Sequence, residues 1–472
     1  MRMSEPKRLH PISAVISCLK QIKDLIIPFL VFVVFGSKNG IFQLIISAVI
    51  IVIVLVIGIL TWLRYTYRLE EGELRIEYGV FVRKKRYIPF ERIQSLDLSE
   101  GILQRPFGLV KVKVETAGSS GEAEAVLTAI TKADANLIQQ TLSAAKASVR
   151  TENVEEPKEN IIYKLSTKEL LQLASTSGGV GVVLSAVIAF VFQFEEIIPY
   201  ERIFSSLGNF ISSGIMTVSI LIFVGFLAAW AIALIGTMVK YAGFTVKKTD
   251  DDLVITRGLL EKRQLTLPLY RIQAIRISEN LIRQPLGLCT VYLESAGGSA
   301  KDTESARVML LPITKRDAIS AILSPYFEDY HLEPAILPVP RRAIRRYMFR
   351  GLLFVLPIIA VSVLFFRPWG YLSFVLVLLS LLWSYLNYKD AGWKVENQQL
   401  TLRYRTIIKN TVFMKRNRIQ SLNTQESYFQ NKKELASIEA KVMSGSGGAG
   451  GTVVDLAKKD CEAIYEWYSY TN

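Results

Sequence analysis

The chain has 472 residues, of which half are hydrophobic and 21% are charged, too much charge for a protein made only of membrane spans. Lys and Arg outnumber Asp and Glu by 56 to 42, and the net charge of +14 suits nucleic acid, an anionic membrane surface or the orientation of membrane helices. The three cysteines, Cys18, Cys289 and Cys461, lie far apart, which excludes a disulfide framework and a CxxC metal site.

Six apolar segments approach the roughly 20 residues that a helix needs to cross a bilayer. They form three pairs: 19–36 with 41–63, 171–193 with 214–238, and 350–366 with 371–388. The connections within the pairs hold only three basic residues, Lys38, Arg202 and Arg367. The positive-inside rule therefore predicts a multi-pass protein of the cell membrane with both termini and all three soluble domains in the cytoplasm.

The third of these segments carries small residues at every fourth position: Ser177, Gly181, Ser185 and Ala189. Such a ridge lets helices pack closely. The alternative is a substrate path along hydroxyl groups of a glycine-interrupted helix. The sequence favours packing, because no ionisable residue lies in the middle of any span, where ion-coupled carriers usually place one.

A small β-rich domain is predicted after the second segment. Residues 74–78 and 81–88 alternate in polarity around Gly79, which is typical of a β-hairpin. Further short strands are predicted at 93–98, 110–116 and 122–130, and residues 132–145 read as an amphipathic helix.

The same domain occurs three times. An ungapped match at an offset of 179 residues links the first two copies, which is the pattern of an internal repeat. The matching positions are Gly79, Pro89, Arg92-Ile93-Gln94, Pro106, Gly108, Glu115 and Ala117-Gly118 in the first copy, and Gly258, Pro268, Arg271-Ile272-Gln273, Pro285, Gly287, Glu294 and Ala296-Gly297 in the second. At an offset of 326, Arg418-Ile419-Gln420 marks a third, diverged copy.

These observations predict membrane α-helical hairpins plus cytoplasmic α+β domains, in three repeats of two transmembrane helices followed by one small domain. The predicted boundaries are 1–63 for the N-terminal segment and first hairpin, 64–149 for the first domain, 150–169 for a linker, 170–240 for the second hairpin, 241–324 for the second domain, 325–349 for a Pro- and Arg-rich linker, 350–388 for the third hairpin and 389–472 for the degenerate third domain.

The repeated motifs resemble those of the bacterial pleckstrin-homology-like (PH-like) domain in membrane proteins of the YdbT type, which has three such repeats. The motifs are Pro89 to Gln94, Gln104 to Leu109 and Glu115 to Gly118, and they recur at Pro268 to Gln273, Arg283 to Leu288 and Glu294 to Gly297. The third copy departs from the pattern with Lys415 and Lys432 in place of the two prolines. The resemblance implies a split seven-stranded β-barrel with a C-terminal helix in each copy.

Basic residues supply the candidate lipid- or partner-binding sites: Arg83, Lys84, Lys85, Arg86, Arg92, Arg271, Arg341, Arg342, Arg345 and Arg346. The run from Arg83 to Arg86 suits an anionic inner leaflet, or it protects an edge strand by charge. Arg92 and Arg271 recur at one position, which fits a ligand contact or an ion pair with Glu115 and Glu294. The cluster before the fifth span fits topology and headgroup contact better than nucleic acid.

No catalytic constellation is visible. Neither His10 nor His331 has a Ser, Cys or metal-ligand partner at a meaningful spacing. We therefore expect no catalytic residue, no cofactor and no metal.

The predicted function is a non-enzymatic membrane scaffold whose PH-like domains bind anionic lipid or protein. The resemblance adds a smaller membrane partner with one PH-like domain and a role in cell-envelope protection. The alternative is a transporter or peptide exporter built from three repeats.

Overall fold

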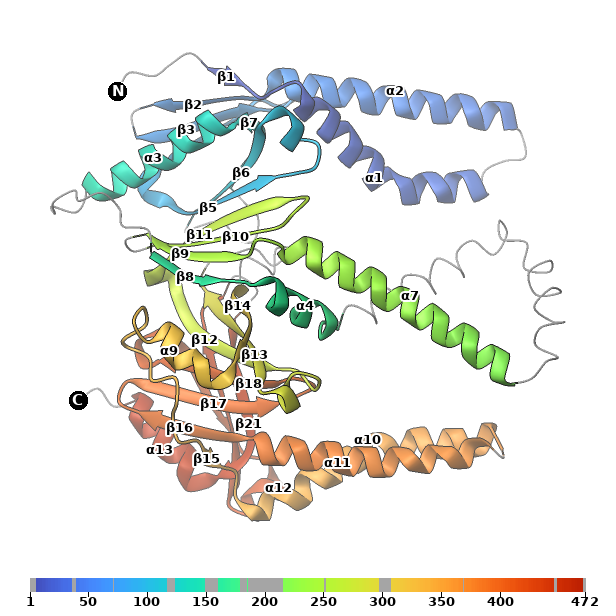
Figure 1. Cartoon of the computed structure of the whole chain (residues 1–472), viewed down its shortest axis with the longest axis vertical. Coiled ribbons are helices and arrows are strands. Elements are labelled where there is room, and N and C mark those ends of the chain that lie inside the picture. Colours follow the sequence, from blue (N-terminus) through green and yellow to red (C-terminus); the bar gives the residue numbers. More distant parts are fainter. Residues whose placement is uncertain are drawn as a thin grey trace. The chain divides into compact units, whose positions relative to one another are not determined.

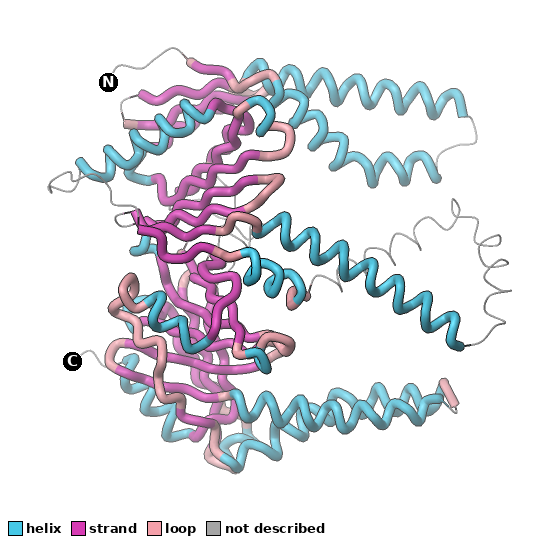
Figure 2. Tube along the Cα trace, in the orientation of Figure 1, coloured by secondary structure: helices cyan, strands magenta, loops and turns pink. Residues whose placement is uncertain are grey.

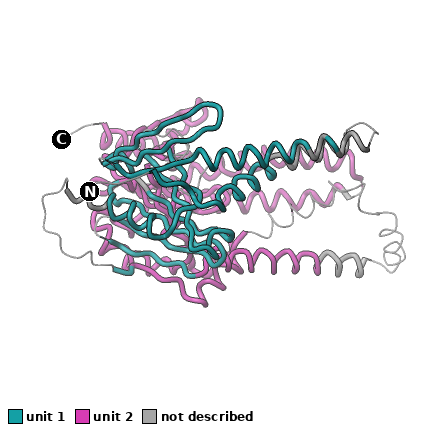
Figure 3. Tube along the Cα trace, turned by 90° about the horizontal axis from the view of Figure 1, so that it is seen from above, with its two compact units in different colours: residues 1–161, 243–270, 297–301 teal, residues 162–242, 271–296, 302–472 magenta. Residues whose placement is uncertain are grey.

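The computed structural model of the chain describes residues 6–35, 40–70, 72–116, 124–148, 160–178, 185, 215–249, 252–296, 307–367, 369–444 and 448–469. Figure 1 labels its elements and Figure 2 separates helices from strands. The chain divides into two compact units, coloured in Figure 3, and the division cuts the second repeat in half. Unit 1 holds the first repeat with residues 243–270, and unit 2 holds residues 271–296 with the third repeat.

Among its described residues, the first repeat contains a helical pair and seven strands. Its elements are β1 (Lys7–Arg8), α1 (Ile12–Phe35), α2 (Gly40–Arg64), β2 (Thr66–Glu70), β3 (Glu73–Tyr78), β4 (Lys84–Pro89), β5 (Ile93–Glu100), β6 (Leu109–Thr116), β7 (Ala125–Thr131) and α3 (Lys132–Ser148). The hairpin, the later strands and the C-terminal helix predicted for this domain are thus confirmed. A short 3-10 turn over Phe90–Arg92 separates β4 from β5.

The second and third repeats follow the same order. The second contains β8 (Asn160–Lys164), α4 (Thr167–Ser175), α7 (Ile215–Tyr241), β9 (Thr245–Thr249), β10 (Asp252–Arg257), β11 (Lys262–Pro268), β12 (Ile272–Glu279), β13 (Leu288–Ser295), β14 (Arg307–Lys315) and α9 (Ile319–Leu323). The third contains β15 (Leu337–Pro338), α10 (Ile344–Phe365), α11 (Val375–Asp390), β16 (Gly392–Glu396), β17 (Gln399–Arg405), β18 (Lys409–Lys415), β19 (Ile419–Gln425), α12 (Tyr428–Asn431), β20 (Leu435–Val442), β21 (Ala449–Ala457) and α13 (Lys458–Ser469).

Three helices among the described residues are long and apolar enough to cross a membrane: Phe223–Tyr241, Arg341–Phe365 and Gly370–Asp390. A shorter apolar helix covers Val49–Arg64. The predicted span 171–193 and the connection after it lie largely outside the described residues, as do Gly181 and Ala189 of the small-residue ridge. Within the described part of that ridge, the Ser177 hydroxyl lies 3.2 Å from the hydroxyl of Thr237 on α7.

Successive repeats share their sheets. In unit 1, β5 of the first repeat pairs antiparallel with β11 of the second, so that β7-β6-β5 continues into β11-β10-β9. In unit 2, β12 of the second repeat pairs in the same way with β18 of the third, and β14-β13-β12 continues into β18-β17-β16-β15. We call these two strand pairs the first and second repeat junctions.

The repeat junctions modify the expected barrel. In the described part of the chain no sheet is closed, and each large sheet combines strands of two repeats. The sequence could not show this, because the repeats carry equivalent strands, and an open strand edge offers the same backbone groups to a neighbouring repeat as to its own.

Both repeat junctions have the same register. Lys262 and Lys409 are the counterparts of Arg83, and they lie opposite Glu100 and Glu279, which are themselves counterparts. Likewise Thr266 lies opposite Leu96, and Phe413 lies opposite Ile275. A one-residue slip would turn every side chain to the other face of the sheet, so a repeated register means a repeated interface.

Short strands before the helical pairs also belong to the domains. β1 pairs with β2, placing Lys7 opposite Tyr67, and β15 pairs with β16, placing Leu337 opposite Trp393. The predicted boundaries left these residues in the segments 1–63 and 325–349. Two-residue strands are too short to produce an alternating pattern, which is why the sequence did not indicate them.

Each described domain core lies between sheet and helix. In the first repeat, Leu74, Val112 and Leu127 from the strands pack with Ile138 and Leu142 of α3. The core of the third repeat includes Ala274 from β12, so the second repeat junction shares side-chain packing as well as backbone pairing. Burial of Ala274 against the third repeat removes apolar surface from water and so adds to the attachment made by the backbone hydrogen bonds.

Candidate functional site

Asp455 attaches helix α10 to the strands of the third repeat. Its carboxylate is fully buried and accepts hydrogen bonds from Arg346 Nε at 2.8 Å and from Arg350, both on α10. The side-chain amide of Gln430 donates a third bond at 2.9 Å. Three donors, two of them charged, offset the cost of burying a carboxylate.

The backbone of β21 explains how Asp455 reaches these partners. The pairing of β20 with β21 shifts between Ala436 and Ile438, which is a β-bulge, and Asp455 adopts a positive φ of 58°. Bulges redirect a side chain out of the regular alternation of a strand. Asp tolerates the left-handed region better than most residues do.

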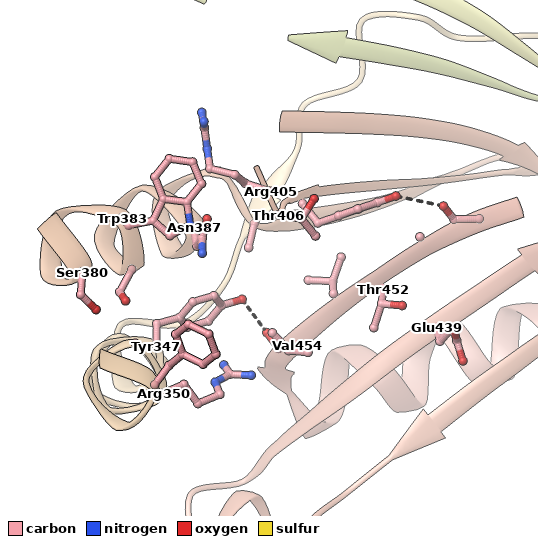
Figure 4. Close-up of a pocket in the computed structure, with 18 of the residues that line it drawn as sticks. Tyr347, Arg350, Ser380, Trp383, Asn387, Arg405, Thr406, Glu439, Thr452 and Val454 are labelled. Atoms are coloured by element: carbon pink, nitrogen blue, oxygen red, sulfur yellow. Dashed lines mark hydrogen bonds between the residues drawn. The ribbon is translucent and has the colours of Figure 1, made fainter. Parts of the chain in front are cut away.

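A pocket of about 880 Å³ lies where α10 and α11 meet β17, β20 and β21 (Figure 4). Phe354, Val355 and Leu379 supply apolar lining from the helices, and α11 also contributes Ser380, Ser384 and Asn387. Tyr347 of α10 and Trp383 of α11 also line the pocket, and the Tyr347 hydroxyl donates to Val454 O at 3.0 Å. The pocket is therefore amphipathic, with an apolar part along the membrane helices and a polar part against the domain.

Two cations line the polar part. The side chain of Arg350 is 47% exposed although it forms an ion pair with Asp455. The side chain of Lys441 is 46% exposed, and its Nζ lies 3.0 Å from the carboxylate of Glu439. Asn387 Oδ1 is buried without a hydrogen-bond partner, so it is an acceptor that a ligand hydroxyl could satisfy. The lining suits a molecule that carries an anionic head, a hydroxyl group and apolar tails.

Arg405 contributes to the same pocket differently. Its guanidinium is directed away from the Tyr347 ring in Figure 4 and forms an ion pair with Asp390 at 2.5 Å. It also donates to Gln284 of the second repeat. Arg405 thus links the end of α11 to the second repeat junction.

A buried ion network continues across that junction. Lys409 Nζ lies 3.2 Å from Glu279, which also pairs with Arg316. Burial lowers the pKa of Lys409 below its ordinary value, and the carboxylates of Glu279 and Asp390 oppose that shift. Beside it, the buried Arg276 Nε lies 2.6 Å from Glu294, and Arg276 Nη1 donates to the Tyr404 hydroxyl of the third repeat at 2.7 Å.

The predicted basic run from Arg83 to Arg86 lies at and just before β4. Arg83 and Lys85 both approach Glu77, whereas Arg86 donates to Glu124 O and lies over the Tyr78 ring. All four side chains are exposed. The structure therefore presents them together on one strand.

The recurring arginine does not occupy one kind of environment. Arg92 is exposed, Arg271 is buried and Arg418 is half-buried. Glu294, one expected partner of this arginine, binds Arg276 and Arg307.

The arginines of the predicted cluster before the fifth span differ in their contacts. Arg342 donates to the side chain and backbone of Glu434, and Arg346 binds Asp455. Arg341 and Arg345 are exposed.

The sequence reasoning missed a polar attachment shared by the three repeats. Gln104, Arg283 and Gln430 are buried counterparts, and each donates to the bulged last strand of its domain, at Thr128 O, Pro312 O and Asp455 respectively. Arg283 also donates to the Thr176 hydroxyl at 2.8 Å, just beyond α4. The available signal was a Gln or Arg two residues before Pro106 and Pro285 in the first two copies, with Gln430 at the same place in the third.

The part of the chain that the structure describes holds no group of three or more His, Cys, Asp or Glu residues that could bind a metal ion. The candidate site is accordingly the amphipathic pocket with Arg350, Lys441 and Asn387.

Shared sheets of small β-domains, each followed by a helix and joined to apolar helices, define a membrane protein with PH-like repeats. The chain belongs to the Bacterial PH domain family, which it matches over residues 24–146, 186–326 and 351–472. It is 39% identical over 487 aligned residues to UPF0699 transmembrane protein YdbT of Bacillus subtilis (strain 168), covering 99% of both chains. UPF0699 transmembrane protein YdbS of the same organism is 34% identical over 55 residues, 12% of this chain and 35% of that protein.

Proposed function

We propose that this protein is a non-enzymatic, multi-pass membrane scaffold with two helices per repeat, cytoplasmic termini and cytoplasmic PH-like domains. We further propose that it holds an anionic phospholipid in the pocket between α10, α11 and the strands of its third domain. The observation that carries the lipid assignment is the amphipathic pocket itself. Apolar side chains of α10 and α11 line one part, and Arg350 and Lys441 line the other.

The chemistry of the lining favours a phospholipid with hydroxyl groups on its head. A phosphate would lie near Arg350 and Lys441, and a head hydroxyl would donate to Asn387 Oδ1. Acyl chains would follow Phe354, Val355 and Leu379 along the membrane helices. Phosphatidylglycerol and cardiolipin have these groups, whereas a nucleotide has no part for the apolar lining.

The electrostatic contribution can be estimated. A Lys or Arg near an anionic membrane contributes about 1 kcal/mol, so two cations contribute about 2 kcal/mol, or roughly 30-fold in occupancy. Asp455 and Glu439 lower this figure by pairing with the same cations, which leaves an expected effect of about tenfold.

The test compares lipid retention by the full chain after extraction in mild detergent. Bound phospholipid is identified by native mass spectrometry in the wild type and in the Arg350→Gln, Lys441→Gln variant. The matched control is Arg345→Gln, Lys389→Gln, which removes two exposed cations of the same helices outside the pocket. We expect retained anionic lipid in the wild type and control, and about tenfold less in the pocket variant.

Equal loss in both variants would mean nonspecific headgroup attraction, and a wild type without anionic lipid would contradict the lipid assignment. The transporter alternative is favoured by no specific contact among the described residues. A role in cell-envelope protection, a smaller PH-like partner and lipid contact by the run from Arg83 to Arg86 stay predictions.

A further inference from the structure

In the described part of the chain, two strands that are equivalent to the strands of the repeat junctions lie at sheet edges. β4 is the last strand of the sheet β1-β2-β3-β4 in unit 1, and β19 is the last strand of β19-β20-β21 in unit 2. Among the described residues, β4 pairs only with β3, and β19 pairs only with β20. An exposed strand edge is a template for another strand.

The open edges are the two complementary halves of a repeat junction. β11 and β18 are the counterparts of β4, and β5 and β12 are the counterparts of β19. Both internal junctions join one strand of each type in one register. Among the described residues, neither β4 nor β19 has a partner of the other type.

Side chains on β4 and β19 are more exposed than their counterparts on the strands that are paired at the repeat junctions. Tyr87 on β4 is 52% exposed, whereas its counterpart Phe413 is 1% exposed opposite Ile275. The second half of β19, from Asn423 to Gln425, is exposed, whereas most of its counterpart β12 is buried.

Charge at the strand ends is complementary as well. Each internal junction places a Lys opposite a Glu: Lys262 opposite Glu100, and Lys409 opposite Glu279. At the open edges the counterparts are Arg83 and Glu426. The basic start of β4 does not exclude pairing, because β11 and β18 also begin with Lys and are both paired.

We propose that β4 of one copy pairs antiparallel with β19 of a second copy, in the register of the internal repeat junctions. That register places Lys85 opposite Thr424 and Arg83 opposite Glu426. Because the two edges differ, the contact is heterologous, and it generates a ring or an open row of copies. This inference deepens the proposed scaffold by naming a second copy as its protein partner, and its test does not depend on lipid retention.

The test uses cysteine pairs in native membranes. Lys85→Cys and Thr424→Cys are placed in two copies with different tags, and an oxidant is added. A disulfide needs Cβ atoms about 3.5–4.5 Å apart, so only facing positions react efficiently. The out-of-register control pairs Lys85→Cys with Gln420→Cys instead of Thr424→Cys. Gln420 is an exposed residue of the same strand, four positions before Thr424.

An internal control reports whether the reaction works. Leu98 lies opposite Gln264 at the first repeat junction and is the counterpart of Thr424, as Gln264 is of Lys85. Leu98→Cys with Gln264→Cys in one chain is expected to form an intramolecular disulfide. We expect a disulfide between the two differently tagged copies for Lys85→Cys with Thr424→Cys, and about tenfold less for Lys85→Cys with Gln420→Cys. A single chain that carries both Lys85→Cys and Thr424→Cys should form a ladder of crosslinked oligomers.

A charge exchange tests the register independently. Arg83→Glu or Glu426→Arg alone should lower the yield of the 85–424 disulfide about two- to fivefold, and both substitutions in one chain should restore it. Within a chain, Arg83 pairs with Glu77 and Glu426 pairs with Lys458, and the double variant repairs neither contact. Restoration therefore reports on contact between copies.

An intramolecular 98–264 disulfide without any 85–424 disulfide between copies would overturn the proposal. So would capture of a different protein at Lys85→Cys with no contribution from Thr424→Cys. Either result would leave the lipid assignment unaffected.

Discussion

A single buried carboxylate can hold an apolar helix against a β-domain, and Asp455 does so through two arginines of α10. Its counterparts in the first two repeats, Ala129 and Ile313, offer backbone carbonyls instead, to His10 N and to the Tyr163 hydroxyl. The same bulged strand therefore contacts the chain near the first helix of the pair in each repeat, through different chemistry.

Asp455→Asn keeps the size of this side chain and removes its charge. We expect a loss of about 1–3 kcal/mol of stability, because Arg346 and Arg350 lose their carboxylate while they stay partly solvated. Thermal unfolding of the full chain in detergent measures the change. Glu434→Gln is the control, since its exposed pair with Arg342 should contribute under about 1 kcal/mol. Equal effects of the two substitutions would contradict the role of Asp455.

Two buried thiols should be unreactive in the folded protein. Burial raises the pKa of Cys289 and of Cys461 from 9.0 to about 12, and the thiolate is the reactive form. We expect no alkylation of either residue at pH 8 before unfolding, measured by mass spectrometry. The stability linked to these thiols is fully present below pH 9 and is lost as the pH rises through about 12, because folding favours the protonated form. Alkylation of the native protein at the rate of a free peptide would contradict the burial.

At the scale of elements, tight turns fix where β4 and β11 begin. Gly79 and Gly258 have φ values of 109° and 103°, and a Cβ atom there would lie 2.0 Å from the carbonyl oxygens of Val82 and Glu261. A side chain at either position therefore meets backbone atoms as well as an unfavourable φ. The third repeat has Arg405 at the counterpart position, so its turn is built differently.

Gly258→Ala should destabilise the protein by about 1–3 kcal/mol, since both backbone strain and a steric overlap follow. Gly287→Ala is the matched comparison: its φ is 64°, and nothing lies within 4 Å of an added Cβ. That substitution should cost about 1–2 kcal/mol at most, the penalty of the left-handed conformation alone. Thermal unfolding of the two variants measures both effects. A larger loss of stability for Gly287→Ala than for Gly258→Ala would contradict the steric overlap at Gly258.

Most elements of the first domain could be predicted from the sequence, because periodicity and turn residues are local signals. The alternation around Gly79 predicted β3 and β4, and the apolar spacing after Lys132 predicted α3. The helix buries Ala135, Ile138 and Leu142. The strand ladders between repeats had no local signal, since β4, β11 and β18 are equivalents that could each pair within or between repeats.

The candidate site was less accessible to sequence reasoning. The predicted cluster from Arg341 to Arg346 lies at the start of α10, next to Arg350. Arg350, Lys441 and Asn387 come from three separate elements, and only the folded chain brings them to one pocket. The sequence did not indicate Asp455, because its role depends on a β-bulge and a positive φ, and neither of these produces a recognisable residue pattern.

At the scale of the whole molecule, the shared sheets imply that the repeats do not fold as three independent domains. The second repeat contributes β9, β10 and β11 to one unit and β12, β13 and β14 to the other. Deleting the first repeat would expose the β11 edge, and deleting the third would expose the β12 edge. A PH-like domain cut out alone would therefore lose strand partners, which is why each test above uses the full chain.

The central claim is that successive repeats pair through the strands that follow and precede the Arg-Ile-Gln triplet. It is tested most directly by comparing two disulfides in the full chain in native membranes. One joins Leu98→Cys to Gln264→Cys, which face each other across the first repeat junction. The other joins Gln264→Cys to Ile277→Cys, the equivalent pair within the second repeat. The account predicts an intramolecular disulfide for the first pair and little for the second, whereas efficient bonding of the second pair alone would mean that each repeat closes its own barrel.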